Sequence, residues 1–218
     1  MNRDFWRARW DEGHIGFHQE QVNPYLQRHW QMLDLSPGKT VFVPLCGKSR
    51  DMLWLRDRGY AVIGVEIVPH AVEAFFVESG LAVTSRPHGA FTLWEAEGIK
   101  IFQGDFFDIT ANDAACIGAV FDRASLIALP PAMRQRYAAH LRSILPEGMN
   151  MLLVTMDYLQ AEMDGPPFAV SEQEIEALYK DSFQIKQVCA EDILANNPRF
   201  REQGLSQGWE KVYSLRSR

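Results

Sequence analysis

The chain of 218 residues has a net charge of −6 and 47% hydrophobic side chains, an ordinary globular composition. The mild acidic excess disfavours a nucleic-acid partner, because phosphate binding needs a basic patch, so a small-molecule substrate is the simpler expectation. Three dispersed cysteines without a CxxC pair indicate neither disulfides nor a zinc site, and no stretch resembles a signal peptide or membrane span, so we expect a cytoplasmic protein without membrane contact.

The first 35 residues predict a helical N-terminal extension, and the rest of the chain alternates between strands and helices. Apolar side chains recur at helical spacing up to Leu33, and Ser36-Pro37-Gly38 then breaks the chain. Helices are expected after Ser49, Pro69 and Pro131, and after the capping box of Ser171 and Glu174. Apolar runs predict strands at 40–45, 60–65, 82–85, 91–94, 99–102, 117–121, 149–155, 183–188 and 209–215.

This alternation predicts a single domain over 1–218 of the α/β class. Its sheet should be doubly wound and mostly parallel, with helices on both faces. The last two strands are separated by one short segment, which favours an antiparallel pair at the sheet edge. Ligands of such sheets bind outside the carboxyl ends of the strands, so the candidate site residues are sought there.

Two residues at strand ends indicate a nucleoside cofactor. Gly47 follows the first strand and would let a ligand approach the backbone, although a plain turn is the alternative. Glu66 ends the second strand, about 20 residues on, where nucleotide-binding α/β folds have the carboxylate that binds ribose hydroxyls. The chain has neither GxGxxG nor GxxxxGK[ST]. A ribose-binding carboxylate without a phosphate loop favours a cofactor that carries no phosphate, such as S-adenosylmethionine.

Two further strand ends carry candidate residues. Asp105 and Phe106 could line an adenine ring, with a turn and a core phenylalanine as the alternative. Asp122 and Arg123 are expected beside the cofactor crevice, with a salt bridge at a strand end as the alternative.

Three residues could suggest other chemistry. His14 and His18 are four residues apart, as metal ligands on one helix can be, but Gly13 and Gly16 disfavour a helix there and we predict no metal site. Cys46 lies next to the cofactor loop. Without a nearby His or Asp pattern, it is predicted to be a buried structural thiol and not a nucleophile.

Several motifs, in order and nearly end to end, make the chain resemble the bacterial thiopurine S-methyltransferases. They are Phe5-Trp6-x-x-x-Trp10, the stretch 43–52, Val65-Glu66, Gly104-Asp105-Phe106-Phe107, Phe121-Asp122-Arg123 and Gly165-Pro166-Pro167-Phe168.

The resemblance implies a class I methyltransferase fold, a Rossmann-like seven-stranded sheet, acting as a cytoplasmic monomer. It implies that S-adenosylmethionine lies against Trp10, Leu45, Glu66 and Arg123, with Gly47, Asp105 and Phe106 close by. The family methylates aromatic thiols, and bacterial members are linked to selenium and tellurium compounds.

Methyl transfer to a thiol needs orientation and a dry pocket. An aromatic thiol ionises readily, so no catalytic base is expected. The resemblance favours Arg123 and Arg199 as cations that steer the thiolate, although Arg199 could be a solvated surface charge. The Trp-rich segment from Met1 to about Gly16 is expected to act as a lid. Two other functions stay open: a cofactor-binding sensor without turnover, and a nicotinamide oxidoreductase, which the missing glycine loop disfavours.

Overall fold

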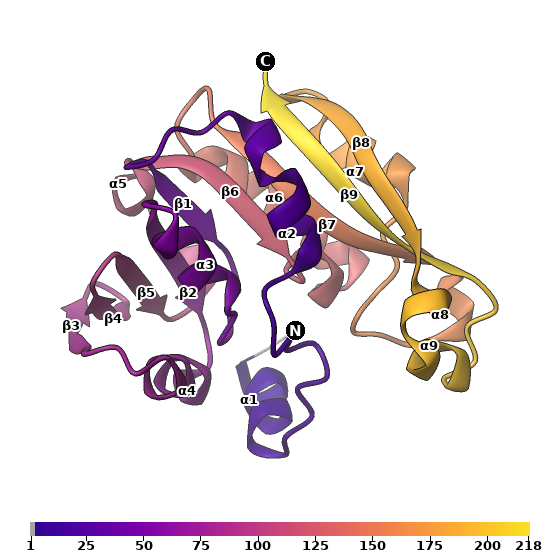
Figure 1. Cartoon of the computed structure of the whole chain (residues 1–218), viewed down its shortest axis with the longest axis horizontal. Helices are drawn as coiled ribbons and strands as arrows, with labels where there is room; N and C mark the ends of the chain where they lie inside the picture. The colour runs from indigo at the N-terminus through magenta and orange to yellow at the C-terminus, as the bar shows by residue number, and fades with distance from the viewer. Residues whose placement is uncertain (1–2) are drawn as a thin grey trace.

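One mixed sheet forms the centre of the molecule (Figure 1). The structure, a computed structural model, describes residues 3–218, so Met1 and Asn2 of the expected lid lie outside it. Within these residues the sheet has nine strands. Their spatial order is β3 (Thr84–His88), β4 (Phe91–Ala96), β5 (Ile99–Gln103), β2 (Ala61–Glu66), β1 (Thr40–Val43), β6 (Ile117–Arg123), β7 (Asn150–Tyr158), β9 (Gly208–Ser217) and β8 (Phe183–Asp192).

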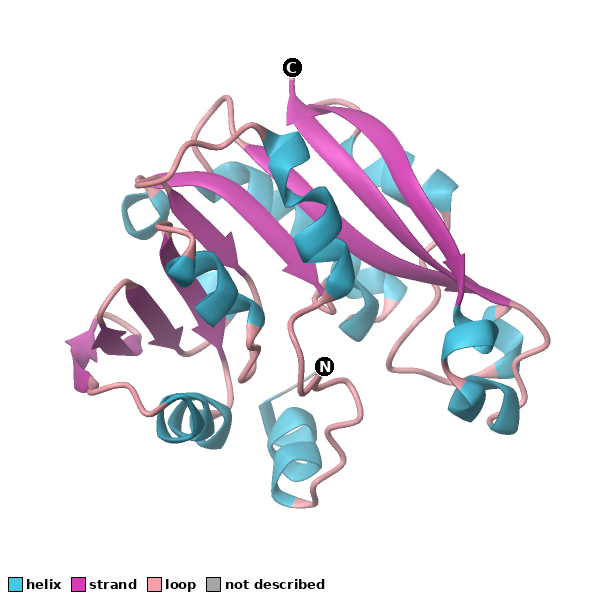
Figure 2. Cartoon of the chain, viewed as in Figure 1, coloured by secondary structure: helices cyan, strands magenta, loops and turns pink. Residues whose placement is uncertain are grey.

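Helices cover both faces of this sheet, as Figure 2 shows in cyan against the magenta strands. The α-helices are α1 (Arg3–Asp11), α2 (Pro24–His29), α3 (Asp51–Asp57), α4 (Pro69–Ser79), α5 (Ala111–Ala114), α6 (Pro131–Ile144), α7 (Glu172–Tyr179), α8 (Ile193–Asn196) and α9 (Pro198–Glu202). Short 3₁₀ helices are η1 (Trp30–Leu33), η2 (Phe106–Asp108), η3 (Leu126–Ala128) and η4 (Gln160–Glu162). None of the helices in residues 3–218 is long and apolar enough to cross a membrane.

Two hydrophobic cores lie on opposite faces of the sheet. Phe121 of β6 packs with residues of α2, α3 and α4, whereas its neighbour Val120 packs with residues of α6 and α7. Successive side chains of a strand point to opposite faces, so the strands contribute to both cores. The continuous apolar runs of the sequence follow from this double burial, and the predicted doubly wound α/β class is confirmed.

The sheet is larger and less parallel than expected. Five neighbouring strands, β5-β2-β1-β6-β7, are parallel, but four further pairings are antiparallel. The expected count of seven strands is wrong because the hairpin β3–β4 pairs with β5 and extends one edge. At the other edge β9 and β8 form the predicted antiparallel pair.

Two predicted helix starts are only partly as expected. The N-cap residue of α3 is Arg50 and not Ser49, although the Ser49 hydroxyl still accepts from the Asp51 backbone N–H at 3.2 Å. Ser171 caps α7 as predicted, accepting from the Glu174 N–H at 3.2 Å. The Glu174 carboxylate, however, pairs at 2.5 Å with Arg134, which is fully buried. An unpaired buried guanidinium would be costly, so the tertiary contact wins over the local one.

The N-terminal extension is not one continuous helical segment. A loop over 12–23 separates α1 from α2, and Gly13 adopts a left-handed conformation with φ +70° at the end of α1. Trp10 of α1 packs against Val68 and Ala71 at the start of α4. This contact holds α1 beside the carboxyl ends of the central strands (Figure 1).

Candidate functional site

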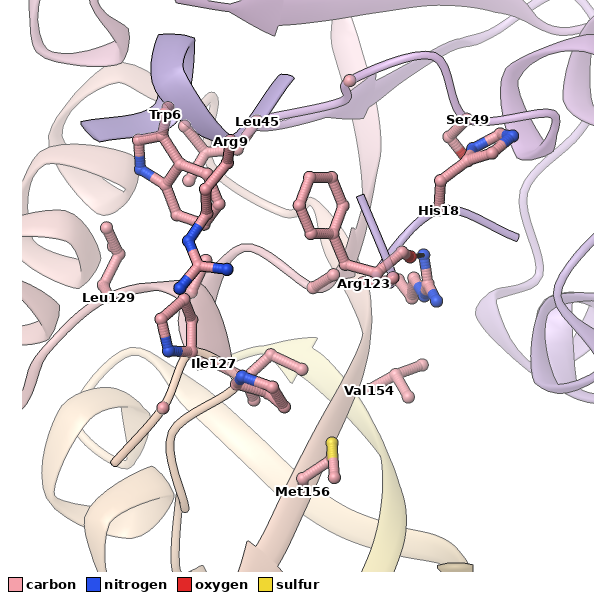
Figure 3. Close-up of a pocket in the computed structure, with 18 of the residues that line it drawn as sticks. Trp6, Arg9, His18, Leu45, Ser49, Arg123, Ile127, Leu129, Val154 and Met156 are labelled. Carbon is pink, nitrogen blue, oxygen red and sulfur yellow. Dashed lines mark hydrogen bonds between the residues drawn. The ribbon is translucent and has the colours of Figure 1, made fainter. Parts of the chain in front are cut away.

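A large cavity opens at the carboxyl ends of the parallel strands (Figure 3). Its volume is about 1060 Å³, at the upper end of what small-molecule sites enclose, which leaves room for two ligands. All the candidate binding residues from the sequence line it: Trp10, Leu45, Gly47, Glu66, Asp105, Phe106, Arg123 and Arg199. The structure therefore brings these residues together from six separate parts of the chain.

Glu66 connects the loops that follow β1 and β2. One carboxylate oxygen accepts from the Gly47 backbone N–H at 2.9 Å and the other from the Val68 N–H at 2.8 Å. Burial raises the pKa of Glu66, and these N–H donors oppose the rise. An ionised carboxylate can accept about four hydrogen bonds, and the Ile67 backbone N–H is a further donor to Glu66, so at least one position remains for a ligand.

The loop after β1 is shaped for close approach. Gly47 has φ +53°, and a Cβ added there would meet the Trp10 ring at 3.3 Å. Leu45 (φ +46°) and Ala124 (φ +68°) are also left-handed, although neither is glycine. Such conformations cost free energy and are concentrated at functional sites. Both residues line the cavity, directly after β1 and β6.

Asp105 and Phe106 have local structural contacts besides their place on the cavity wall. The Asp105 carboxylate accepts from the Phe107 N–H at 2.9 Å and so caps η2. Phe106 is 3% exposed and packs against Tyr137, with ring centroids 4.8 Å apart. These contacts fit the alternative of a turn with a core phenylalanine. Both residues nevertheless also line the cavity.

Asp122 and Arg123 point to opposite faces of β6. Asp122 accepts from the Tyr137 hydroxyl at 2.7 Å inside the core and does not line the cavity, so its expected place beside the crevice is wrong. Arg123 faces the cavity and donates to the Phe17 carbonyl at 3.0 Å. A salt bridge between the two residues is therefore also wrong, because adjacent strand residues diverge.

Arg123 is surrounded by negative charge. Burial lowers its pKa, and the carboxylates of Asp51 and Glu210 oppose that change. Burial also raises the pKa of both carboxyl groups, and Arg123 partly offsets each rise. One cation thus stands against two carboxylates, which leaves little positive charge for an anionic ligand.

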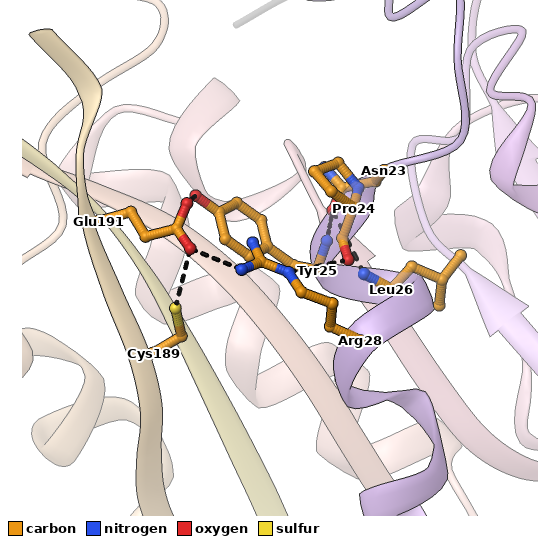
Figure 4. Close-up of polar contacts among 7 residues, drawn as sticks. All are labelled: Asn23, Pro24, Tyr25, Leu26, Arg28, Cys189 and Glu191. Carbon is orange, nitrogen blue, oxygen red and sulfur yellow. Dashed lines mark hydrogen bonds and ion pairs between the residues drawn. The ribbon is translucent and has the colours of Figure 1, made fainter. Parts of the chain in front are cut away.

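Tyr25, which lines the cavity, also contacts a carboxylate of β8 (Figure 4). Glu210 and Glu191 lie directly opposite each other on β9 and β8, where like charges repel. The Tyr25 hydroxyl donates to Glu191 at 3.0 Å, and Arg28 donates to the same carboxylate at 2.7 Å. These contacts from α2 offset the repulsion. Sequence analysis missed this group, because its members come from three distant segments without a shared pattern.

Two arginines bring charge to the cavity from outside the sheet. Arg199 of α9 lies so close to the loop after α1 that a Cβ on Gly16 would be 2.5 Å from its Nη1. Arg9 of α1 lines the same cavity and was not identified from the sequence. Its only signal there is a charged residue beside Trp10 in an aromatic helix.

The histidines and Cys46 have ordinary surroundings. His14 is exposed beside Glu12, and burial lowers the pKa of His18, whose side chain is 7% exposed. Among residues 3–218 no group of three His, Cys, Asp or Glu side chains is arranged to hold a metal. Cys46 is 6% exposed, and burial raises its pKa well above the usual range. The predicted burial of this thiol is confirmed, and Cys46 also lines the cavity. Its lack of a nucleophilic role stays a prediction.

Comparisons with known proteins agree on one family. The sequence model of the thiopurine S-methyltransferase family matches residues 1–218. Thiopurine S-methyltransferases of Nitrosospira multiformis and Azotobacter vinelandii are 50% and 49% identical to this chain, covering all of it and 99% and 100% of the relatives.

Solved structures show the same fold at low identity. A SAM-dependent methyltransferase from Anabaena variabilis has a TM-score of 0.69 at 15% identity, covering 100% of this chain and 96% of that one. The 1,6-didemethyltoxoflavin-N1-methyltransferase of Burkholderia thailandensis, with 1,6-didemethyltoxoflavin and S-adenosylhomocysteine bound, has a TM-score of 0.64 at 16% identity, covering 99% and 86%.

Replacing Arg123 by methionine should destabilise the fold at pH 7 by about 3 kcal/mol, because it leaves two enclosed carboxylates without their cation. The pKa values of Asp51 and Glu210 in the folded state, already raised, should rise further. The folded state then binds more protons than the unfolded state, so the lost stability should return as the pH falls from 7 to 5.

Urea unfolding of both proteins across this range measures the difference. Arg136→Met is the matched control, since Arg136 lines the same cavity but stacks on Phe107 at 3.8 Å. The change in unfolding free energy that Arg136→Met causes should be the same at every pH in this range. A difference in unfolding free energy between the wild type and Arg123→Met that stays constant from pH 5 to 7 would contradict the pairing of Arg123 with Asp51 and Glu210.

Proposed function

Because the chain belongs to the thiopurine S-methyltransferase family, we propose that it methylates the sulfur of aromatic and heterocyclic thiols. It is an S-adenosylmethionine-dependent methyltransferase that acts on small molecules. One observation carries the proposal: a cavity large enough for cofactor and substrate combines a ribose-type carboxylate with arginines on its outer wall. Selenium and tellurium compounds are proposed as further substrates, by analogy with bacterial members of the family.

The residues of the cavity fit S-adenosylmethionine. Glu66 retains at least one acceptor position for ribose hydroxyls, and the left-handed Gly47 leaves no Cβ between the backbone and Trp10. We propose that these residues hold the cofactor together with Leu45, Asp105, Phe106 and Arg123. When bound, it supplies an electrophilic methyl group: a new S–C bond forms while the sulfonium C–S bond breaks and leaves its electron pair on the cofactor sulfur.

We propose that the enzyme acts by orientation and thiolate capture, without a catalytic base. Arg123 was an expected steering cation, but Asp51 and Glu210 offset its charge. Arg199 therefore takes the larger share in holding the thiolate, since no carboxylate among residues 3–218 lies within 4.0 Å of its guanidinium. An opposite charge within a few ångströms lowers the pKa of a thiol.

We also propose that the chain works as a monomer in the cytoplasm, as the family resemblance implies. A solution mass of twice 24.9 kDa, measured by light scattering, would contradict the first part.

Labelled S-adenosylmethionine offered with aromatic thiols, selenite and tellurite should yield methylated thiols. For each thiol the rate should rise through the pKa of that thiol, and thiols of lower pKa should move the rise to lower pH. Arg199→Ala should reduce the rate and shift the rise to higher pH, because the bound thiol ionises less easily.

Mass spectrometry identifies the product, and rates at a series of pH values locate the rise. Arg201→Ala on the same helix is the control, since Arg201 is exposed and does not line the cavity. A rise fixed at one pH for every thiol would reveal a base in the enzyme. Failure to methylate any thiol would refute the proposed substrate class.

Glu66→Ala should weaken binding of S-adenosylhomocysteine by about 10- to 150-fold, which corresponds to roughly 1.5–3 kcal/mol for a charge-assisted hydrogen bond. Titration calorimetry measures the affinity. Glu73→Ala on the exposed face of α4 is the control. Because Glu66 also holds Gly47 and Val68, thermal unfolding without ligand must show that the variant is folded. Unchanged affinity in a folded variant means that the ribose assignment is wrong.

The segment from Met1 to about Gly16, within the extension of residues 1–35, is proposed to be a lid. Trp10 against Gly47 and the Arg123 bond to the Phe17 carbonyl support this role, because both contacts join the segment to the cavity wall. Amide hydrogen exchange in this segment should slow when S-adenosylhomocysteine is added. Exchange in α7, which does not line the cavity, should stay the same. Equal exchange in the segment with and without ligand would refute the lid.

A further inference from the structure

Arg9 lines the cavity together with several other cations. Lys48 pairs with Glu78 at 2.6 Å, and Arg123 lies near the carboxylates of Asp51 and Glu210, whereas Arg136, like Arg9, stacks on a phenylalanine ring. Among residues 3–218, no carboxylate lies within 4.0 Å of the Arg9 guanidinium. Its positive charge is therefore available to a ligand.

The Arg9 side chain is also partly withdrawn from water. Its Nε is buried and has no hydrogen-bond partner among the residues that the structure describes, and the guanidinium lies over the Phe5 ring, 4.8 Å from the centroid. A buried donor without a partner costs free energy, and an acceptor supplied by a ligand would recover it. The stacking on Phe5 restricts the side chain, so less conformational entropy is lost when the ligand binds.

Apolar side chains line the cavity that Arg9 reaches. Figure 3 shows Arg9 and Trp6 entering it from α1, and Leu129 and Ile127 are among the other residues that line it. Leu129 is 6% exposed, and Ile127 packs against buried residues of both neighbouring clusters. A cation over apolar walls suits a flat ring that carries one negative substituent.

We propose that Arg9 binds the anionic substituent of an aromatic thiol substrate, a carboxylate or a ring oxyanion, and so determines substrate specificity. The inference rests on the proposed function, since it takes the thiol as the substrate. Arg199 holds the sulfur end, and Arg9 holds the substituent against the wall of Ile127 and Leu129. Because Arg9 belongs to α1, binding of an anionic substrate also favours the conformation in which the lid covers the cavity.

Two matched thiols test this role: 4-mercaptobenzoate and thiophenol, which differ by one carboxylate. Arg9→Ala should lower kcat/KM for 4-mercaptobenzoate by about tenfold or more, mainly through KM, and for thiophenol by less than about twofold. Arg9→Lys should restore part of the loss, because it keeps the charge without the planar fork. Affinity for S-adenosylhomocysteine should not change.

Arg7→Ala is the control on the same helix. Arg7 is two positions from Arg9, on the opposite side of α1, where it is exposed and lies 3.6 Å from Asp11. Its removal should affect neither thiol. Equal losses for both thiols with Arg9→Ala would overturn the proposal. A drop in S-adenosylhomocysteine affinity with an unchanged thiol ratio would do the same, because it would assign Arg9 to the cofactor.

A binding measurement separates this inference from the proposed function. Calorimetry of 4-mercaptobenzoate with the protein saturated by S-adenosylhomocysteine needs no turnover. Tight binding that Arg9→Ala weakens supports the anion subsite even where no thiol is methylated. Methylation of both thiols with no difference between wild type and Arg9→Ala leaves the proposed function intact and rejects the role of Arg9.

Discussion

A buried carboxylate at the end of β2 fixes the shape of the cavity. Glu66 is 6% exposed, and its desolvation is offset by the backbone N–H groups of Gly47 and Val68. Those two donors belong to the loops after β1 and β2, so one side chain holds both loops at a fixed separation. The left-handed Gly47 and the Trp10 ring packed above it depend on that position. Any change in this carboxylate therefore acts on the fold and on the site together.

Charge is distributed unevenly around the cavity. Asp51 and Glu210 outnumber Arg123 at the wall near α2 and β9. Arg9 and Arg199 approach from α1 and α9, and no carboxylate in the described part of the chain lies within 4.0 Å of either guanidinium. A low-dielectric enclosure strengthens such differences. A sulfonium cofactor and a thiolate substrate have opposite charges, and a cavity with one negative and one positive side suits both. The chain has an overall net charge of −6, so this pattern is local and cannot be inferred from composition.

The features that could be predicted from the sequence are those that depend on a local pattern of residue types. Apolar runs identified the central strands, and Ser171 caps α7 as its position predicts. Glu66 and Gly47 could be predicted as site residues because each belongs to a local feature, a strand end and a turn respectively. Such features restrict the residue type within a few positions of the chain. The roles of Asp122 and Glu174 were misjudged, since each turns to a partner far along the chain, Tyr137 and Arg134 respectively. Contacts of that kind depend on helix packing, which a single sequence does not encode in its periodicity.

The sides of the cavity that we propose for the cofactor and for the substrate have different structural origins. Strand ends of the sheet supply Glu66 and Arg123, which pair with neighbouring strands, and Leu45 lies two residues beyond the end of β1. The opposite side comes from α1 and α9, which lie outside the sheet at the edge to which the central strands point (Figure 1). Segments free of the sheet can change sequence without disturbing its pairing. Substrate preference should therefore vary with residues such as Arg9 and Arg199, while the cofactor half stays constrained by the fold.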